Sequence, residues 1–236
     1  MIFLSKQSKT KIDETDNFVI LIIQILLMKT TFFLLFIIFG TFCFAQKEFQ
    51  PKNSTIIETV DGDLDGDRIP EKVIVYDITS ENTREIQILK KMNNKWKILE
   101  KSRSAILGNE DGGMMGDPFL YCKIENGILI TSHYGGSSWK WGFVDKYRFQ
   151  NGHFELIGHS SEGGRPGDFW STTDFNLSTG KLVYKKEVEN FSIPENGKSE
   201  SETFIKKGIK INLKNRNSTD YKLRFKLPKT KKEIYL

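Results

Sequence analysis

The sequence predicts an all-β protein, an antiparallel meander that forms a sandwich, an open barrel or a strongly twisted sheet, preceded by an N-terminal signal segment. First, short runs of β-branched and aromatic residues alternate with turn residues along most of the chain. Second, Asn-Gly stands between two such runs at Asn126-Gly127 and again at Asn151-Gly152, the strongest short-range hairpin signal. Third, no helical period follows the signal segment.

Each predicted strand is followed closely by a turn signal and a partner strand. The first two strands, 56–60 and 72–78, flank an acidic segment. The hairpins expected after them are 85–89 with 95–99, 120–124 with 128–132, 145–149 with 153–157, 173–177 with 181–184, and 204–205 with 209–213. Ten or more strands in succession indicate one domain over residues 46–236, which is long enough to bury one sizeable core.

Two segments look less regular, and one cysteine stands alone. Residues 189–202 are polar and predict a long exposed loop, whereas the tail from Lys210 is basic. We expect that tail to be a strand with a solvated lysine face and a frayed end; the alternative is a patch that attracts an acidic surface. Cys122 lies in an apolar run and is expected to be a buried small hydrophobe.

The N-terminal residues predict export. Residues 28–45 have a positive start at Lys29, an apolar run and a small-residue cleavage site before Gln46, the organisation of a signal peptide. Residues 1–27 then precede the true start of translation, at Met28. The predicted location is secreted or periplasmic, with membrane contact only through the signal segment. The alternative is an uncleaved anchor over residues 18–45.

An acidic segment, Asp61 to Glu71, is the densest chemical signal in the chain. It holds five carboxylates in eleven residues, four of them at every second position, and such crowding favours a bound cation. An EF-hand starting at Asp61 is excluded, because its twelfth position is Lys72 and a strand follows where a helix is required. Starting from Asp63, the expected calcium ligands are the side chains of Asp63, Asp65, Asp67 and Glu71 and the carbonyl of Ile69.

In this register, residues 63–75 resemble the calcium loop of FG-GAP and VCBS-type repeats, which leads directly into a strand. The motif occurs once, which argues against a full propeller. Arg68 stands where those repeats carry glycine, and a left-handed backbone there would cost about 1–2 kcal/mol. Glu71 replaces the usual aspartate. The alternative to a metal loop is a solvated acidic turn, which Asp and Gly also favour.

A second candidate site spans two glycine-rich stretches, 109–118 and 133–141. Antiparallel pairing of the strands between them would bring both stretches to one end of a sheet. Glycines allow close backbone approach, and aromatic side chains beside polar groups suit sugar or peptide binding. The expected ligand-binding residues are Glu110, Asp111, Asp117, His133, Tyr134, Ser137 and Trp139.

Residues 56–184 as a whole are similar to small exported bacterial proteins of unassigned function with a single FG-GAP/VCBS-type loop. The shared stretches are Asp-Gly-Gly…Gly-Asp-Pro (111–118), Tyr-Gly-Gly-Ser…Trp (134–139) and a Tyr-x-Phe…Leu-Ile-Gly stretch (147–158). The resemblance implies an exported all-β protein with a calcium loop and supplies no activity.

The predicted function is therefore a calcium-binding, non-enzymatic binding or cell-envelope module, whose partner would be a carbohydrate, a peptide or an envelope component. One alternative is a secreted hydrolase that acts on carbohydrate or peptide through carboxylates of the 109–118 loop. Another is a purely structural envelope protein. No nucleophile stands in an elbow or triad motif, and the histidines lack the spacing of a zinc set. The net charge of +5 is too small to suggest nucleic acid as a partner.

Overall fold

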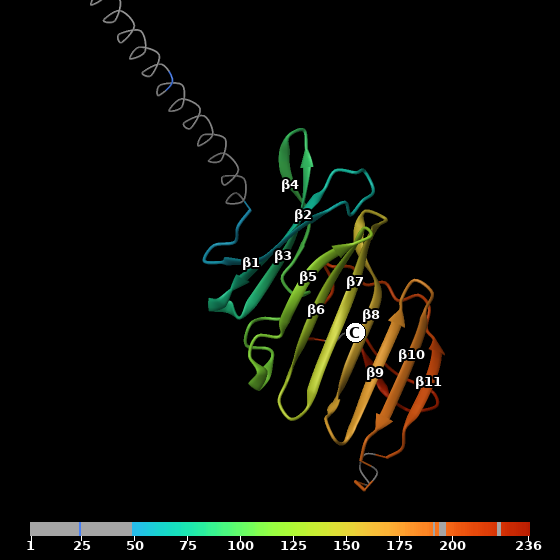
Figure 1. Cartoon of the computed structure of the whole chain (residues 1–236). Helices are drawn as coiled ribbons and strands as arrows, with labels where there is room; N and C mark the ends of the chain where they lie inside the picture. The colour runs from blue at the N-terminus through green and yellow to red at the C-terminus, as the bar shows by residue number, and fades with distance from the viewer. Residues whose placement is uncertain (1–23, 25–48, 191, 194–196, 221–222) are drawn as a thin grey trace, which may run out of the picture. The chain divides into compact units, whose positions relative to one another are not determined.

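The computed structural model describes Gln24 and residues 49–236, except 191, 194–196 and 221–222. The predicted signal peptide, 28–45, and nearly all of residues 1–27 lie outside the described residues. Pro51–Leu236 forms one compact unit, shown in Figure 1, and its sheets are antiparallel. The prediction of an all-β fold is thus confirmed, with open sheets and no closed barrel among the described strands. No described helix is both long and apolar enough to cross a membrane.

The first sheet contains four strands in sequence order. They are β1 (Thr55–Gly62), β2 (Glu71–Ile78), β3 (Thr83–Met92) and β4 (Lys95–Ser102). A short 3-10 turn, η1 (Thr79–Glu81), joins β2 to β3. β2 lies in the interior of the sheet and is mostly buried on both faces, which explains its nearly continuous apolar run. The acidic segment is the turn between β1 and β2.

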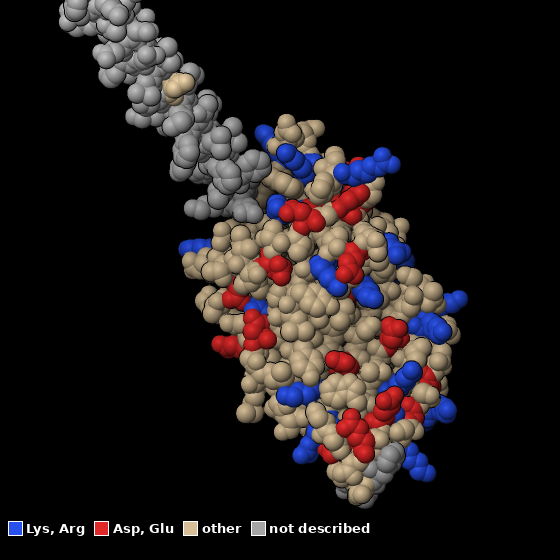
Figure 2. All heavy atoms as spheres, viewed as in Figure 1, with Lys and Arg blue, Asp and Glu red and all other residues tan. Residues whose placement is uncertain are grey.

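The second sheet contains seven strands, again in sequence order. They are β5 (Phe119–Glu125), β6 (Ile128–Gly136), β7 (Lys140–Gln150), β8 (His153–Arg165), β9 (Phe169–Asn176), β10 (Lys181–Val188) and β11 (Glu200–Ile205). A second 3-10 turn, η2 (Gly113–Met115), precedes β5. Figure 2 shows basic and acidic side chains mixed over the face in view, without a broad patch of one sign.

Both Asn-Gly pairs form the predicted hairpin turns. Asn126 and Gly127 have φ values of 52° and 72°, and Asn151 and Gly152 have 54° and 79°. Positive φ at both central residues is the geometry that matches the twist of the flanking strands. The Asn93–Asn94 turn between β3 and β4 likewise has φ values of 50° and 59°. Local turn chemistry thus sets the register of these hairpins.

The C-terminal segment has the predicted strands and a solvated lysine face, with Lys226, Lys229 and Lys231 exposed, but its end is not frayed as predicted. It forms the hairpin β12 (Arg224–Lys226) with β13 (Glu233–Tyr235), and it runs behind the seven-stranded sheet in Figure 1. Its apolar side chains are buried in the core with residues of both larger sheets; they are Leu213, Leu227, Ile234 and Leu236. The lysines alternate with these apolar positions, so the charge count hides an inward face.

One face of the seven-stranded sheet is therefore covered, and we call it the inner face. The main core lies against it and includes Val75 and Ile86 of the first sheet with Cys122 and Tyr147 of the second. Cys122 is buried as predicted, and burial raises the pKa of its thiol to about 12.

Candidate functional site

Three carboxylates of the acidic segment converge in space. One oxygen from each of Asp63, Asp65 and Glu71 lies within 4.8 Å of the other two, which is close enough to share one metal ion. Asp63 and Asp65 stand in the β1–β2 turn, and Glu71 is the first residue of β2. Three of the four predicted carboxylate ligands thus meet.

Glu71 is the structural centre of this group, because it is fully buried. Its Oε2 accepts a hydrogen bond from the Leu64 amide at 2.8 Å. Its Oε1 is also buried and has no hydrogen-bond partner among the described residues. A buried carboxylate is costly unless a cation or several donors compensate it. The position of Glu71 therefore demands a positive charge nearby.

Lys90, on β3, supplies that charge in the structure. Its Nζ contacts Asp65, lies 2.6 Å from Asp67 Oδ2 and lies 3.4 Å from Glu71 Oε1. Burial opposes the charge on this amine, but the hydrogen bonds to Asp65 and Asp67 outweigh it and raise the pKa of Lys90 above its usual range. The same hydrogen bond from Lys90 is the main reason that the pKa of Asp67 is lowered. Asp67 thus faces the ammonium group.

Hydrogen bonds from backbone amides to the aspartates hold the backbone of the loop. Asp63 accepts hydrogen bonds from the amides of Gly66, at 2.7 Å, and Arg68, at 3.0 Å. Asp67 accepts one from the Ile69 amide at 2.8 Å. Arg68 has a φ of 68°, so the left-handed conformation expected at this position is present without the usual glycine. Ile69, whose carbonyl is the fifth predicted ligand, is exposed.

Comparisons of the sequence with protein-family models and with curated proteins give no match. The similarity to FG-GAP and VCBS-type loops therefore stays a prediction. What this chain can do must be inferred from the geometry of its own residues.

Two residues of the predicted ligand-binding surface instead hold loops together. Asp111 accepts hydrogen bonds from the Gly108 amide, at 2.8 Å, and from Asn82 Nδ2, at 3.0 Å. The carboxylate of Asp117 accepts hydrogen bonds from both terminal nitrogens of Arg84, at 2.7 and 2.5 Å. Arg84 is 1% exposed and also donates to Asp77 Oδ1, at 3.1 Å, so it joins β2 and β3 to the loop that precedes β5. Burial alone would raise the pKa of Asp117, but Arg84 lowers it.

The other predicted residues point in different directions. The glycine-rich stretches do meet, because the Gly136 amide donates to the Gly112 carbonyl at 2.8 Å. His133 is buried on the inner face and stacks on Phe143, with ring centroids 4.6 Å apart. Tyr134 follows it directly on β6 and so faces the opposite side of the sheet.

The remaining three residues of that prediction lie at the surface. Trp139 is half exposed and contacts Phe169 edge-on at 5.3 Å. Ser137 and Glu110 are exposed, and the Glu110 amide donates to Asn82 Oδ1 at 2.9 Å. The structure does not gather the seven predicted residues into one site.

A polar cluster that the sequence analysis did not identify lies on the inner face of β7 and β8. Asp145 is fully buried, and its carboxylate meets His159 Nδ1 at 2.6 Å, Arg216 Nε at 2.8 Å and the Tyr147 hydroxyl at 3.2 Å. Burial opposes its charge, but Arg216 and His159 outweigh burial and hold the pKa of Asp145 well below its usual range. A charged carboxylate in the core is thus stabilised by a cation from the C-terminal segment.

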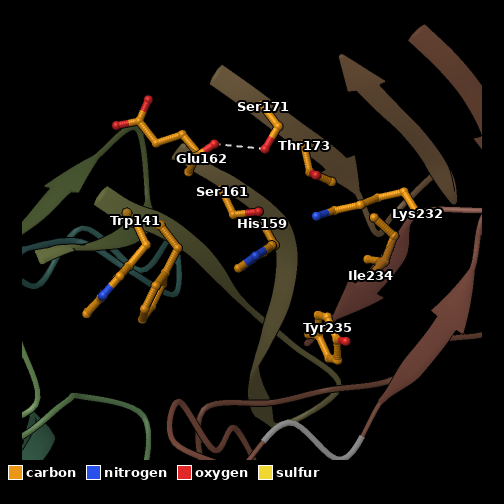
Figure 3. A pocket seen from close by; sticks show the side chains of 12 residues that line it. Trp141, His159, Ser161, Glu162, Ser171, Thr173, Lys232, Ile234 and Tyr235 are labelled. Atoms are coloured by element: carbon orange, nitrogen blue, oxygen red, sulfur yellow. Dashed lines mark hydrogen bonds between the residues drawn. The ribbon is translucent and has the colours of Figure 1, made fainter. Parts of the chain in front are cut away.

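A cavity of about 290 Å³ lies beside this cluster, between β7–β9 and the C-terminal hairpin. Figure 3 shows Trp141 and His159 on one side of it and Lys232, Ile234 and Tyr235 on the other. Segments distant in sequence create this space, namely strands β7–β9 and the C-terminal hairpin. No local motif could have revealed it, since His159 and Ser161 lie beyond the predicted strand 153–157.

Proposed function

We propose that this protein is an exported, calcium-binding β module that acts by binding rather than by catalysis. The observation that carries the proposal is the convergence of Asp63, Asp65 and Glu71, with a fully buried Glu71 Oε1 that no described residue hydrogen-bonds. Oxygen donors at this spacing suit a hard divalent cation, and calcium accepts about six to eight of them. Asp67 and the Ile69 carbonyl would complete the protein ligands.

The role of the ion would be structural. Glu71 begins β2, and Lys90 lies on the neighbouring strand β3, so an ion at this point joins the β1–β2 turn to the first sheet. An ion that binds only the folded state stabilises it by mass action, by about 2.7 kcal/mol at a hundred times the dissociation constant. Calcium would displace the Lys90 ammonium group, because both need the same carboxylate oxygens.

Binding is favoured over hydrolysis by the roles of the loop carboxylates. A hydrolase that used the 109–118 loop would need carboxylates available to a substrate. Two of the three loop carboxylates, Asp111 and Asp117, are instead occupied by hydrogen bonds that hold Gly108, Asn82 and Arg84, which leaves the exposed Glu110 as a single carboxylate where the reaction needs two. The proposed export of the protein depends on the predicted signal peptide, and its partner would be a carbohydrate, peptide or other component of the envelope.

Calorimetric titration of calcium into the chelator-treated protein tests the proposal, with Asp65→Asn as the test variant and Asp61→Asn as its control. Both substitutions remove one negative charge from the same turn, but Asp61 pairs with Lys72 at 2.7 Å and lies outside the converging group. We expect micromolar to millimolar binding that Asp65→Asn abolishes and Asp61→Asn weakens only a few-fold. Absence of binding, or equal losses in both variants, would reduce the segment to an acidic turn.

A further inference from the structure

The inner face of the seven-stranded sheet is apolar over one part and polar over another. The apolar part includes Leu129, Phe154 and Leu182, all fully buried. Along the same face of β7, β8 and β9 follow Asp145, His159, Ser161 and Thr173, which the register places on adjacent strands. A covered sheet face normally carries apolar residues, so polar side chains at these positions are a local exception to the pattern that folds the rest.

These polar side chains do not all pack against the core; several line the 290 Å³ cavity instead. The volume lies at the lower end of the range for small-molecule sites, about 300–1,000 Å³, and so suits one small ring. The lining of the cavity includes Trp141, His159, Ser161, Thr173, Lys232 and Tyr235. None of them belongs to the acidic segment, so this site is independent of the calcium proposal.

His159 is held in one orientation toward the cavity. Asp145 Oδ1 lies 2.6 Å from His159 Nδ1. The other carboxylate oxygen, Oδ2, accepts a hydrogen bond from Arg216 Nε at 2.8 Å, and this cation keeps the carboxylate charged. A charged aspartate makes Nδ1 the donor, and Nε2 is then the ring nitrogen that can hydrogen-bond a ligand hydroxyl. The ring is only 4% exposed, so its alignment is fixed by burial as well.

The charge near the cavity favours an anion. Lys232 extends its amino end toward the space between Thr173 and His159, whereas the carboxylate of Glu162 points away from the cavity (Figure 3). Asp145 and Arg216 compensate each other at 2.8 Å. The hydroxyls of Ser161 and Thr173 add neutral donors on the sheet side. A carboxylate placed here would meet one ammonium group and two hydroxyls.

The walls of the cavity suit a ring. Trp141 and Phe143 are stacked side by side, with centroids 6.3 Å apart and an interplanar angle of 16°, and Tyr235 lies across the cavity. Flat aromatic surfaces next to hydrogen-bonding groups bind the C–H face of a sugar. We propose that this cavity binds a sugar acid, with its carboxylate at Lys232, a hydroxyl at His159 Nε2 and its ring against Trp141.

Sodium D-glucuronate is the direct probe, with D-glucose as the neutral control, acetate as the carboxylate without a ring, and a short glutamate peptide as the competing class of ligand. Binding is followed by the NMR shifts of the His159 ring nitrogens and the Trp141 indole on the full chain. A ligand of about thirteen non-hydrogen atoms should bind with a Kd on the order of 1 mM. Glucose and acetate should bind at least tenfold more weakly.

Two variants test the geometry, and one serves as control. Lys232→Gln should weaken glucuronate binding about tenfold or more, whereas Lys229→Gln, an exposed lysine of the same segment that does not line the cavity, should not change it. Ser161→Leu should fill the cavity and abolish binding even if Lys232→Gln failed to fold. Equal affinity for glucose, tighter binding of the peptide, or glucuronate shifts that persist in Ser161→Leu would each overturn the proposal.

Discussion

Replacing Lys90 by methionine separates the two cations that compete for the acidic segment. Methionine keeps most of the aliphatic stem and removes the ammonium group that contacts Asp65, Asp67 and Glu71. Glu71 is fully buried, and the loss of its ion pair leaves Oε1 uncompensated. Without calcium we therefore expect the free energy of unfolding to fall by about 1–3 kcal/mol, the cost of a buried polar group without a partner.

The affinity for calcium should change in the opposite direction. In the natural protein an incoming ion must displace the ammonium group from its partly exposed ion pair with Asp65, worth about 0.2–1 kcal/mol, and from its contacts with Asp67 and Glu71. Removing this competition should add about 1–2 kcal/mol to binding, a roughly five- to thirtyfold lower Kd. The variant should be less stable than the natural protein in chelator and at least as stable in saturating calcium.

Urea denaturation with and without calcium measures both effects, and calorimetry gives the Kd directly. Lys91→Met is the matched control, because Lys91 is the next residue of β3 and its side chain is exposed. It should leave both quantities within about 0.5 kcal/mol of the natural values. Weaker calcium binding in Lys90→Met, or unchanged stability in chelator, would show that the ammonium group does not occupy the place of the cation.

Three further substitutions test other parts of the structure. Arg68→Gly should stabilise the protein by about 1 kcal/mol, because φ there is 68°, and thermal unfolding should show a higher Tm. Asp117→Asn should cost about 1–3 kcal/mol in urea, since buried Arg84 loses its bidentate partner. Burial lowers the pKa of His133 to about 4, so its neutral form stabilises the fold above pH 6.5 and that stability is lost as the pH falls toward 4. His133→Phe should remove on the order of 3 kcal/mol of this pH dependence, which urea unfolding at pH 7.5 and 4.5 can measure; an unchanged slope would contradict the assignment.

Most of the strands and hairpins could be predicted from sequence because their causes are local. Asn126-Gly127 and Asn151-Gly152 adopt the positive φ that such turns favour, and the period-2 burial at the start of β8 shows which of its faces is buried. The hairpin expected between 204–205 and 209–213 is wrong, because Ile211 and Leu213 form backbone hydrogen bonds with β8 instead. The C-terminal segment shows the limit of this approach. Its described lysines are exposed as predicted, but the predicted frayed end is wrong, because Leu213, Leu227 and Ile234 are buried against the seven-stranded sheet.

The candidate sites divide in the same way. The positions of Asp63, Asp65 and Glu71 along the chain already predict their convergence, because the first two stand two residues apart in a tight turn and Glu71 begins the strand that leaves it. The position of Lys90 beside these carboxylates depends on how β3 pairs with β2. That register depends on residues far apart in the sequence, so the turn alone does not predict it. Seven residues between 109 and 141 were predicted to share a surface because the two loops that carry them meet. The loops do meet. Successive residues on a strand nevertheless face opposite sides, and this separates His133 from Tyr134.

Distant cations compensate the carboxylates in this protein, and the remaining imbalance shows what each site can accept. Arg84 and Arg216 neutralise Asp117 and Asp145, so those pairs are structural. Around Lys90, four carboxylates face one ammonium group, which leaves an excess of three negative charges for a divalent cation. At the cavity the imbalance has the opposite sign, because Lys232 contacts the Tyr184 ring and forms no ion pair among the described residues. The two proposed sites, for a cation in the β1–β2 turn and for an anion beneath the C-terminal hairpin, share no residue, so each can be lost without the other.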